Sequence, residues 1–247
     1  MPRSSGKKFR DSFLPFVFIL SFFVLVIFGV TFWHDTAKRE EALNIEVSPL
    51  QGETLMQPWG TSVWNSVKKS TKLSQGDFVK TEAEGRSGVH FFDSVWMRLG
   101  YNSLVSFENS QPEGDSYRLS FSYTNGSLWF STNPEKSQGV SLLIDGGYLR
   151  VQNQGTIFSL EDTAEGSKGH TVRVLDGTVY VDIVDPVNSR TVDTIVVSAG
   201  KQFVLPDDVY QSLLEYAPTP DIEDISEDFY TSDWYLWNTK LDQQKQE

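Results

Sequence analysis

The chain has 247 residues, with 21 Lys and Arg against 33 Asp and Glu, a formal net charge of −12 and no cysteine. The lack of cysteine excludes disulfides, thiol catalysis and Cys-ligated zinc. The acidity argues against a nucleic-acid partner, because phosphates attract a basic protein surface.

The first predicted element is a transmembrane helix over residues 13–33. Its sequence, FLPFVFILSFFVLVIFGVTFW, contains no charged residue. A helix of this length extends about 31 Å, enough to cross a hydrocarbon core of about 30 Å. Residues 1–12 carry four basic residues and one acidic residue. The positive-inside rule therefore predicts a cytoplasmic tail over residues 1–12 and an extracytoplasmic remainder, in the periplasm or at the cell surface.

A cleaved signal peptide is the alternative interpretation of this segment. Signal peptides have an apolar region of about 7–15 residues followed by small residues at the cleavage site. Here the apolar run is longer, and Val30-Thr31-Phe32-Trp33 is bulky. We therefore favour an uncleaved, single-pass anchor in the cytoplasmic membrane.

Residues 34–45 are polar and predict a short stalk, and residues 46–206 predict a mainly β domain. Short runs of alternating apolar residues recur there between Gly, Asn, Asp and Ser, without a helical apolar period. This pattern favours an antiparallel, multi-stranded sandwich or barrel-like fold. Asn125-Gly126 lies between two runs and predicts a tight hairpin. The predicted strands are 78–81, 88–92, 95–99, 104–107, 117–123, 128–131, 140–144, 148–152, 156–160, 171–175, 178–184, 191–197 and 202–205.

Residues 207–247 predict an acidic, extended linker and a short amphipathic C-terminal helix. Ser232 is its predicted N-cap. Four apolar side chains at helical spacing define the predicted partner-docking face: Tyr230, Trp234, Trp237 and Leu241. Because short helices are marginal alone, packing on the chain's own β domain is one use of this face, and docking on a partner is the other.

Residues typical of catalysis are few and scattered. The three histidines, His34, His90 and His170, are far apart in the sequence. There is no G-x-S-x-G, H-E-x-x-H, Walker or G-x-G-x-x-G motif. The carboxylates fall mostly in predicted turns, where solvated side chains are the ordinary interpretation. We therefore predict no catalytic residue, no metal ligand and no cofactor.

Several segments, taken in order, resemble the FecR domain family over about residues 47–206. The resemblance rests on Gly76-Asp77 with the strand after it, on Arg98-Leu99 and on Gly126-Ser127-Leu128-Trp129. It continues with Gly155-Thr156, Val172 to Val181 and Ala199-Gly200-Lys201-Gln202. The segment Trp234 to Asn238, with Asp242, is also similar to a short C-terminal segment of some of these proteins. These residues define a scaffold, so the resemblance implies a fold and carries over no catalytic residue.

The best-known FecR proteins are inner-membrane regulators that pass a signal from an outer-membrane receptor to a cytoplasmic sigma factor. They contact the sigma factor through a cytoplasmic domain, whereas only 12 residues precede the predicted helix here. The resemblance therefore implies an anchored FecR-like protein without that domain. We expect a non-enzymatic binding or scaffold module with a protein or cell-envelope partner. Transmembrane signalling through another membrane protein is the alternative, and a cell-wall sugar hydrolase is a third.

Overall fold

The computed structural model describes residues 21–26, 45–91, 95–113, 116–132, 140–162, 169–185, 187–205 and 222–244. The chain divides into two units, Met1–Asn44 and Ile45–Glu247. Residues 21–26 are helical, and the rest of the predicted anchor, residues 13–33, lies outside the described residues, as do the tail and residues 34–44. Within the described ranges, no helix is long and apolar enough to cross a membrane.

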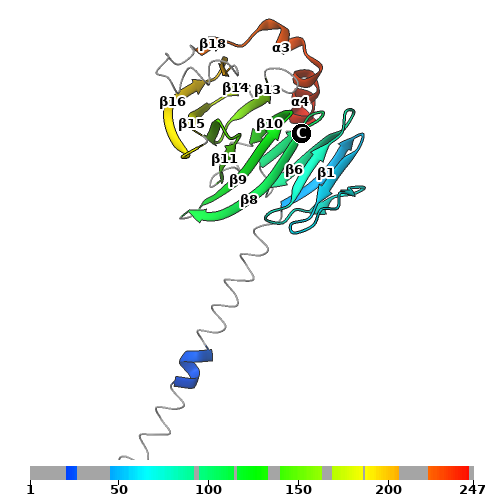
Figure 1. Cartoon of the computed structure of the whole chain (residues 1–247), viewed down its shortest axis with the longest axis vertical. Coiled ribbons are helices and arrows are strands. Elements are labelled where there is room, and N and C mark those ends of the chain that lie inside the picture. The colour runs from blue at the N-terminus through cyan, green and yellow to red at the C-terminus, as the bar shows by residue number, and fades with distance from the viewer. Residues whose placement is uncertain are drawn as a thin grey trace, which may run out of the picture. The chain divides into compact units, whose positions relative to one another are not determined.

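The unit Ile45–Glu247 is built on two sheets (Figure 1). Sheet A has nine strands in the spatial order β18 (Ile222–Asp224), β17 (Lys201–Leu205), β14 (His170–Asp176), β13 (Ile157–Asp162), β10 (Ser127–Thr132), β7 (Val95–Leu99), β6 (Arg86–Phe91), β1 (Ile45–Gln51) and β4 (Thr71–Lys72). Sheet B has nine in the order β16 (Arg190–Ser198), β15 (Thr178–Asp185), β12 (Leu149–Gln154), β11 (Val140–Asp145), β9 (Ser116–Asn125), β8 (Leu104–Glu113), β5 (Phe78–Thr81), β2 (Thr54–Gln57) and β3 (Asn65–Ser66). Two short helices follow β18, α3 (Glu227–Thr231) and α4 (Asp233–Gln244).

The prediction of a mainly β fold is confirmed. Among the described strands every paired neighbour is antiparallel except β9 and β11, which run parallel because the chain leaves sheet B for β10 and then returns. The barrel-like alternative is wrong for the described strands, because each sheet runs as an open series with a terminal strand at either end.

Buried apolar side chains of both sheets form one hydrophobic core. Along sheet A, Val89, Met97 and Phe130 stand on neighbouring strands and are fully buried. Sheet B contributes Phe121 and Val181 to the same cluster. Alternation places these side chains on one face of each strand, and each buried residue of this size contributes about 1.5–3 kcal/mol. The recurrence of apolar residues at every second position in the sequence therefore follows from strands with one face in the core.

The turn at Asn125-Gly126 is not the predicted hairpin. It joins β9 in sheet B to β10 in sheet A, so the two flanking strands do not pair. Gly126 has φ of 102°, and a Cβ there would lie 2.4 Å from Ser103 Cα. Asp176-Gly177 makes the same kind of passage from β14 to β15, with φ of 78° at Gly177. The sequence signal for a sharp turn was correct, but it marks a change of sheet.

The outward face of sheet A is also covered. Cross-strand register brings Arg98, Trp129, Ser159, Arg173 and Gln202 into one row across β7, β10, β13, β14 and β17. These residues alternate with core residues, so their side chains point away from the core. Three of the five, Arg98, Trp129 and Ser159, are nevertheless at most 1% exposed. Figure 1 shows α4 beside β10, and this helix supplies the cover.

Candidate functional site

The C-terminal helices sit over three arginines of sheet A. Arg86 lies on β6, Arg98 on β7 and Arg173 on β14. Arg86 is 3% exposed and Arg98 is 1% exposed. Charged side chains are rarely so buried without partners. The partners that satisfy them come largely from residues 227–244, which form the candidate site.

Ser232 separates α3 from α4. Its backbone ψ of 147° ends α3, and the Tyr235 N–H donates to Ser232 Oγ at 3.2 Å. The Leu236 N–H donates to the Ser232 carbonyl at 3.0 Å, which is the first helical bond of α4. Ser232 therefore caps α4, as predicted. The predicted continuous face is wrong in one respect, because the break places Tyr230 on α3.

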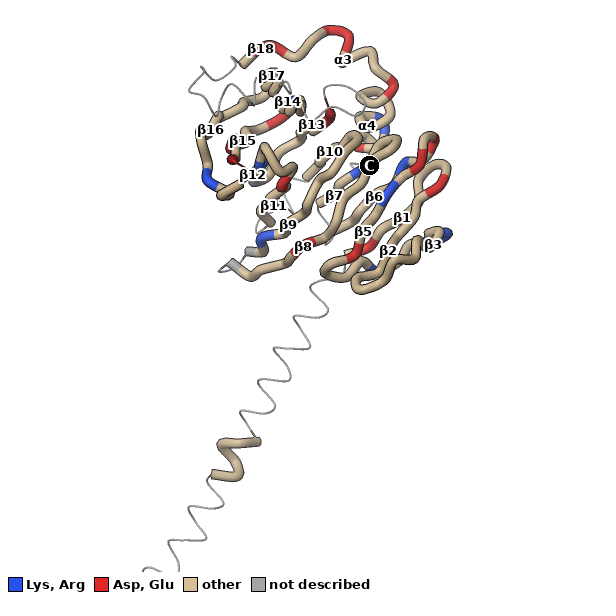
Figure 2. Tube along the Cα trace, in the orientation of Figure 1, with Lys and Arg blue, Asp and Glu red and all other residues tan. Residues whose placement is uncertain are grey.

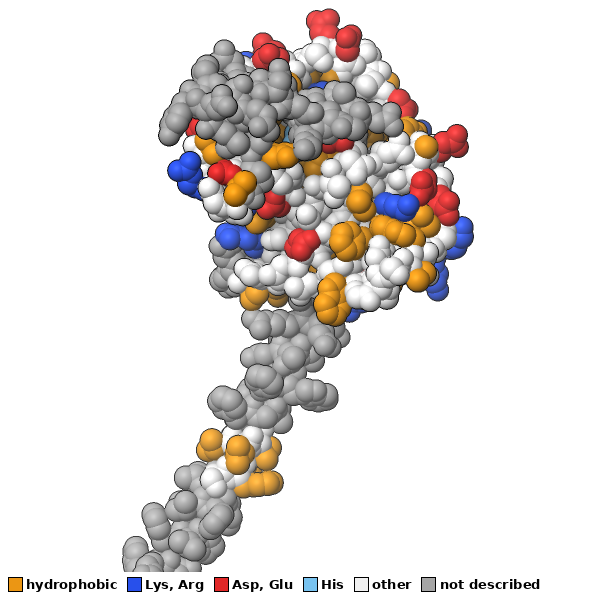
Figure 3. Space-filling model, viewed as in Figure 1, with side chains coloured by type: hydrophobic (Ala, Val, Ile, Leu, Met, Phe, Trp, Pro, Cys, Tyr) orange, Lys and Arg blue, Asp and Glu red, His pale blue; other side chains and the backbone are white. Residues whose placement is uncertain are grey.

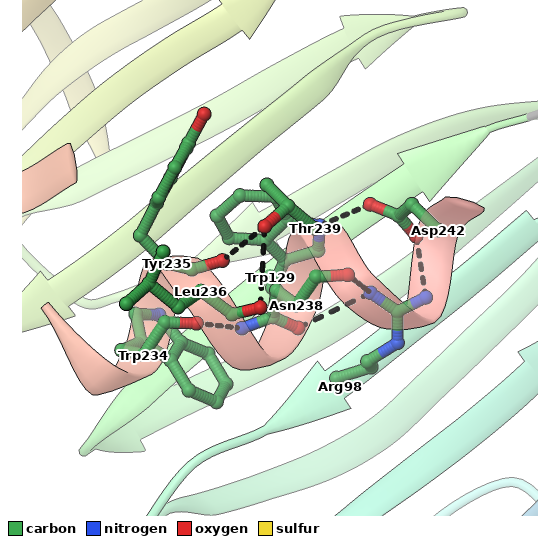
Figure 4. A network of polar contacts seen from close by, with 8 residues as sticks. All are labelled: Arg98, Trp129, Trp234, Tyr235, Leu236, Asn238, Thr239 and Asp242. Atoms are coloured by element: carbon green, nitrogen blue, oxygen red, sulfur yellow. Dashed lines mark hydrogen bonds and ion pairs between the residues drawn. The ribbon is translucent and has the colours of Figure 1, made fainter. Parts of the chain in front are cut away.

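Arg98 is the centre of the polar network between α4 and sheet A (Figure 4). Its Nη1 donates to the backbone oxygen of Asn238 at 3.3 Å and to Asn238 Oδ1 at 3.2 Å. Its Nη2 donates to Asp242 Oδ1 in an ion pair. The second oxygen of Asp242 accepts from Trp129 Nε1 at 3.0 Å. One carboxylate thus engages two neighbouring strands, because Arg98 and Trp129 are opposite each other in the register.

Burial makes this network sensitive to the loss of a partner. Arg98 has a side-chain exposure of 1%, and that of Asp242 is 13%. Breaking such a pair leaves an uncompensated buried charge and costs about 3–5 kcal/mol. Asn238 is itself fully buried, and its Nδ2 donates to the Trp234 carbonyl at 2.9 Å. Each polar atom of the network is therefore held by at least one other, which fixes the position of α4.

A second cluster surrounds Arg86 at the start of α4. The guanidinium lies 4.4 Å from the ring centroid of Tyr101 and 4.6 Å from that of Trp237. Trp234 lies 5.8 Å away on the same helix. Asp233 forms an ion pair with Arg86, although the Asp233 side chain is 76% exposed. Aromatic faces attract cations, so this cluster combines charge with apolar cover.

Arg173 holds α3. Its guanidinium lies 4.5 Å from the ring of Phe229, and its Nη1 lies 3.1 Å from Glu161 Oε1. Phe229 and Ile225 form a small buried cluster with Trp129, against which Tyr235 packs. Ile225 and Ser226 connect α3 to β18, and the three residues of β18 pair with β17. Within the predicted extended linker, residues 222–224 thus form β18 and residues 227–228 begin α3, whereas residues 206–221 lie outside the described residues.

The structure divides the predicted docking face. Trp234, Trp237 and Leu241 are half-buried, and Trp234 and Trp237 contact Ser159 and Arg86 of sheet A, whereas Tyr230 is 37% exposed. Leu236, which the sequence argument did not single out, is 54% exposed on the outward side of α4. Packing on the chain's own β domain is therefore observed, and only Tyr230 and Leu236 remain as large exposed apolar side chains on α3 and α4.

Sequence reasoning missed Arg98, Asn238 and Asp242 as a group. Two signals could have found them. Arg98 alternates with core residues in β7, which places a charge on a face that also carries Trp129. Trp234, Asn238 and Asp242 follow one another at intervals of four, so one helical stripe presents all three.

A separate buried group lies where β13 ends and β14 begins, and it includes Tyr123 of β9 in sheet B. His170 is 3% exposed, and its Nδ1 lies 3.4 Å from Asp162 Oδ1. The Tyr123 hydroxyl lies 2.7 Å from the same oxygen. Burial first, and then the charge of Asp162, raises the pKa of Tyr123 well above its ordinary value. A phenol held protonated in this way acts as a hydrogen-bond donor that fixes Asp162, whose other oxygen accepts from the Gly126 N–H at 2.9 Å.

Comparison with known proteins identifies the scaffold. Residues 77–180 match the family model described as "FecR protein". Over this segment the chain is similar to the FecR family. The matched span contains Arg98 and Trp129, and it ends before β18, α3 and α4. The helix that covers the FecR strands is thus contributed by residues beyond the matched segment.

Two solved structures of a "putative anti-sigma factor" from Parabacteroides distasonis ATCC 8503, at 1.65 and 2.50 Å resolution, are similar to this chain. Each match has a TM-score of 0.43 and 13% sequence identity over 61% of this chain, and it spans 59% of the length of that protein. No curated protein matches the sequence.

Proposed function

We propose that this chain is a non-enzymatic, FecR-type binding module that takes part in signalling at the cell envelope. Its docked C-terminal helices would present Tyr230 and Leu236 to a protein partner. The observation that carries the proposal is the attachment of α4 to the FecR strands through Arg98, which turns a short helix into a rigid part of the domain.

Rigidity matters because a preorganised surface loses little conformational entropy on binding. Near its start α4 is held by Asp233 on Arg86, and near its end by Asp242 on Arg98. Between these two points, Leu236 projects outward and is 54% exposed. A large apolar residue fixed in this way is the kind of anchor that dominates protein–protein contacts.

Binding is favoured over catalysis by the state of the polar groups. Arg98, Asp242 and Asn238 are bonded to one another and enclosed between α4 and sheet A. His170, with Asp162 beside it, is 3% exposed. A catalytic group must reach its substrate, and these groups are covered by other parts of the protein.

The FecR domain supports a regulatory use of the binding surface, since the best-known FecR proteins transmit signals. We propose that residues 13–33 anchor the chain in the cytoplasmic membrane, with residues 34–247 on the extracytoplasmic side. In that arrangement the short tail would act through another membrane protein, and the FecR domain would bind outside.

Crosslinking followed by recovery of the full-length chain from membranes tests this proposal. We expect the wild-type chain to recover a specific protein and Leu236→Glu to lose it, because a charge replaces the exposed apolar anchor. Val187→Glu is the matched control, since Val187 is 90% exposed in the turn before β16. Recovery of the same protein by Leu236→Glu, or of no specific protein by the wild type, would argue against the proposal.

A further inference from the structure

Residues 57–75, here called the basic aromatic corner, differ in composition from the rest of the chain. They contain Lys68, Lys69 and Lys72, two of the seven tryptophans, and no Asp or Glu, whereas the whole chain has a net charge of −12. The corner includes β3 and β4 and the loops beside them. Figure 2 shows basic positions at the β3 end of the tube.

Trp59 is exposed although its backbone is fixed. The residue is 75% exposed, the largest such fraction for any described aromatic residue. The Trp59 N–H donates to Asp77 Oδ1 at 2.8 Å, and Asp77 Oδ2 accepts from the Ser74 N–H at 2.8 Å. The indole lies against Gly76, where an added Cβ would come within 2.1 Å of the ring. The fold therefore holds a large aromatic ring in solvent.

Other apolar side chains extend this surface. Val63 is 59% exposed, and Phe78 at the start of β5 is 38% exposed. Trp64 is half-buried, with the Lys80 ammonium 5.0 Å from its ring centroid. Figure 3 shows hydrophobic and basic side chains, with acidic side chains beside them, at the end of the molecule that holds β2, β3 and β5.

The three lysines are exposed beside this apolar surface. Glu46 is the acidic residue opposite them, because it pairs with Lys72 in the register of β1 and β4. Glu46 also accepts a hydrogen bond from the Ser70 hydroxyl. Two carboxylates therefore contact the corner, Glu46 and Asp77, and Asp77 is bonded to the backbone N–H groups of Trp59 and Ser74. Three ammonium groups against these two carboxylates leave the corner with a net positive charge, opposite in sign to that of the chain as a whole.

The corner adjoins the first residue of the domain. The Leu73 N–H donates to the Ile45 carbonyl at 2.8 Å, and Val47 pairs with Thr71. From Trp33, the end of the proposed anchor, to Ile45 there are twelve peptide steps. These span about 18 Å as a helix and about 40 Å when extended. The domain is therefore tethered close enough for this end to reach the membrane surface.

We propose that the basic aromatic corner rests on the anionic lipid surface of the membrane in which the chain is anchored. Tryptophan favours the lipid–water interface, and each lysine near an anionic surface is attracted to it. The proposal rests on the anchored topology of the proposed function. It favours lipid over a protein partner because exposed tryptophan and lysine occur together at the tethered end of an otherwise acidic domain.

The full-length chain in lipid vesicles provides the test. The chain has no cysteine, so Ser62→Cys, in the exposed loop between Trp59 and β3, can carry a single environment-sensitive fluorophore. Val187→Cys is the control, because it is 90% exposed and lies in a different turn, before β16. We expect a blue-shifted emission at position 62 in vesicles containing phosphatidylglycerol, a smaller shift in pure phosphatidylcholine and no shift at position 187.

Replacing Lys68, Lys69 and Lys72 together by Gln should remove most of that difference, since each lysine is worth about a fivefold change in affinity for an anionic surface. Emission at position 62 that is equal in both lipids, or that shifts only when a protein extract is added, would overturn the proposal. Flotation with phosphatidylcholine vesicles reports the anchor by itself. If the chain floats but its emission at position 62 does not depend on the lipid, the proposed contact of the corner with lipid is refuted. If the chain floats with neither lipid, the proposed anchor and the proposed lipid contact are both refuted.

Discussion

Replacing Asp242 by Asn tests the attachment of α4 most sharply. The carboxylate accepts hydrogen bonds from Arg98 and from Trp129 Nε1, one on each oxygen. Asn has nearly the same shape, but one of its two positions is an NH₂ donor. Whichever way the amide turns, that donor faces another donor, and the charge that balanced Arg98 is lost.

The magnitude follows from burial. Loss of one partner from a buried ion pair costs about 3–5 kcal/mol. Arg98 would keep the two oxygens of Asn238, at 3.3 and 3.2 Å, and the helix can lift so that water reaches the guanidinium. Both effects limit the loss, so we expect Asp242→Asn to lower the free energy of unfolding by about 3 kcal/mol.

Asp233→Asn is the matched control on the same helix. Asp233 also pairs with a buried arginine, Arg86, but its own side chain is 76% exposed. An exposed carboxylate contributes about 0–1 kcal/mol, and Arg86 retains the rings of Tyr101 and Trp237. We therefore expect a loss below about 1 kcal/mol for this variant.

Equilibrium urea unfolding of the full chain in detergent micelles, followed by tryptophan fluorescence, measures both losses. Hydrogen exchange of the α4 amides then shows whether the helix lifts before the sheets unfold. The reasoning is refuted if Asp242→Asn unfolds within about 0.5 kcal/mol of wild type, or if Asp233→Asn is as destabilising as Asp242→Asn.

Three further predictions concern other parts of the domain. Because the folded protein raises the pKa of Tyr123, the stabilisation from its protonated hydroxyl is present below the unfolded pKa, near 10, and is lost as the pH rises above that value. In a plot of unfolding free energy against pH, the wild-type curve should therefore fall more steeply than the Tyr123→Phe curve, by up to about 1.4 kcal/mol per pH unit. Parallel curves would contradict this. Gly147 has φ of 82° and no atom within 4 Å of an added Cβ, so Gly147→Ala should lower the free energy of unfolding in urea by about 1 kcal/mol. In Gly126→Ala the added Cβ would also collide with Ser103, so the loss should be at least about twice as large. Equal losses would show that the turn at Gly126 rearranges to accept the methyl group. In Gly100→Leu the new side chain should push against the Trp234 ring, which lies 3.3 Å from an added Cβ. Amide hydrogen exchange in α4 should therefore become faster, while exchange in β10 stays slow. Unchanged exchange in α4 would mean that the helix tolerates the added side chain.

The strands were predictable because sheet periodicity is local. Val95, Met97 and Leu99 recur at every second position, as expected for one buried face, and β7 has the predicted bounds in the structure. The same alternation explains why the pairing was harder to predict. Asn125-Gly126 reads as a hairpin from its neighbours in the sequence, but only long-range contacts decide that β9 pairs with β8 and β11 while β10 pairs with β7 and β13.

The candidate site was predicted in part for a similar reason. The aromatic spacing from Trp234 to Leu241 correctly indicated a helix with a face toward another surface, and Ser232 correctly marked its start. The polar centre was missed because Arg98 and Asp242 are 144 positions apart, and each one alone resembles an ordinary surface charge. Only the register of β7 and β10, together with the cover of α4, turns them into a buried pair.

The exposed tryptophan shows a second limit of sequence reasoning. Large aromatic residues are usually buried, so the general rule does not predict the exposure of Trp59. In the structure the turn around Asp77 and Gly76 holds the ring outside, which depends on a backbone conformation with φ of 86° at Gly76. No apolar periodicity marks such a position, so its exposure becomes visible only with the fold.

Site-specific photocrosslinking from position 236 of the full-length chain in membranes tests the central claim most directly. A photoreactive residue at Leu236 should form one specific protein adduct, while the same residue at Val187 should not, and Asp242→Asn should abolish the adduct by releasing α4 from Arg98. The account is contradicted if position 236 forms no adduct, or if the adduct persists at wild-type yield when hydrogen exchange shows that Asp242→Asn has released the helix.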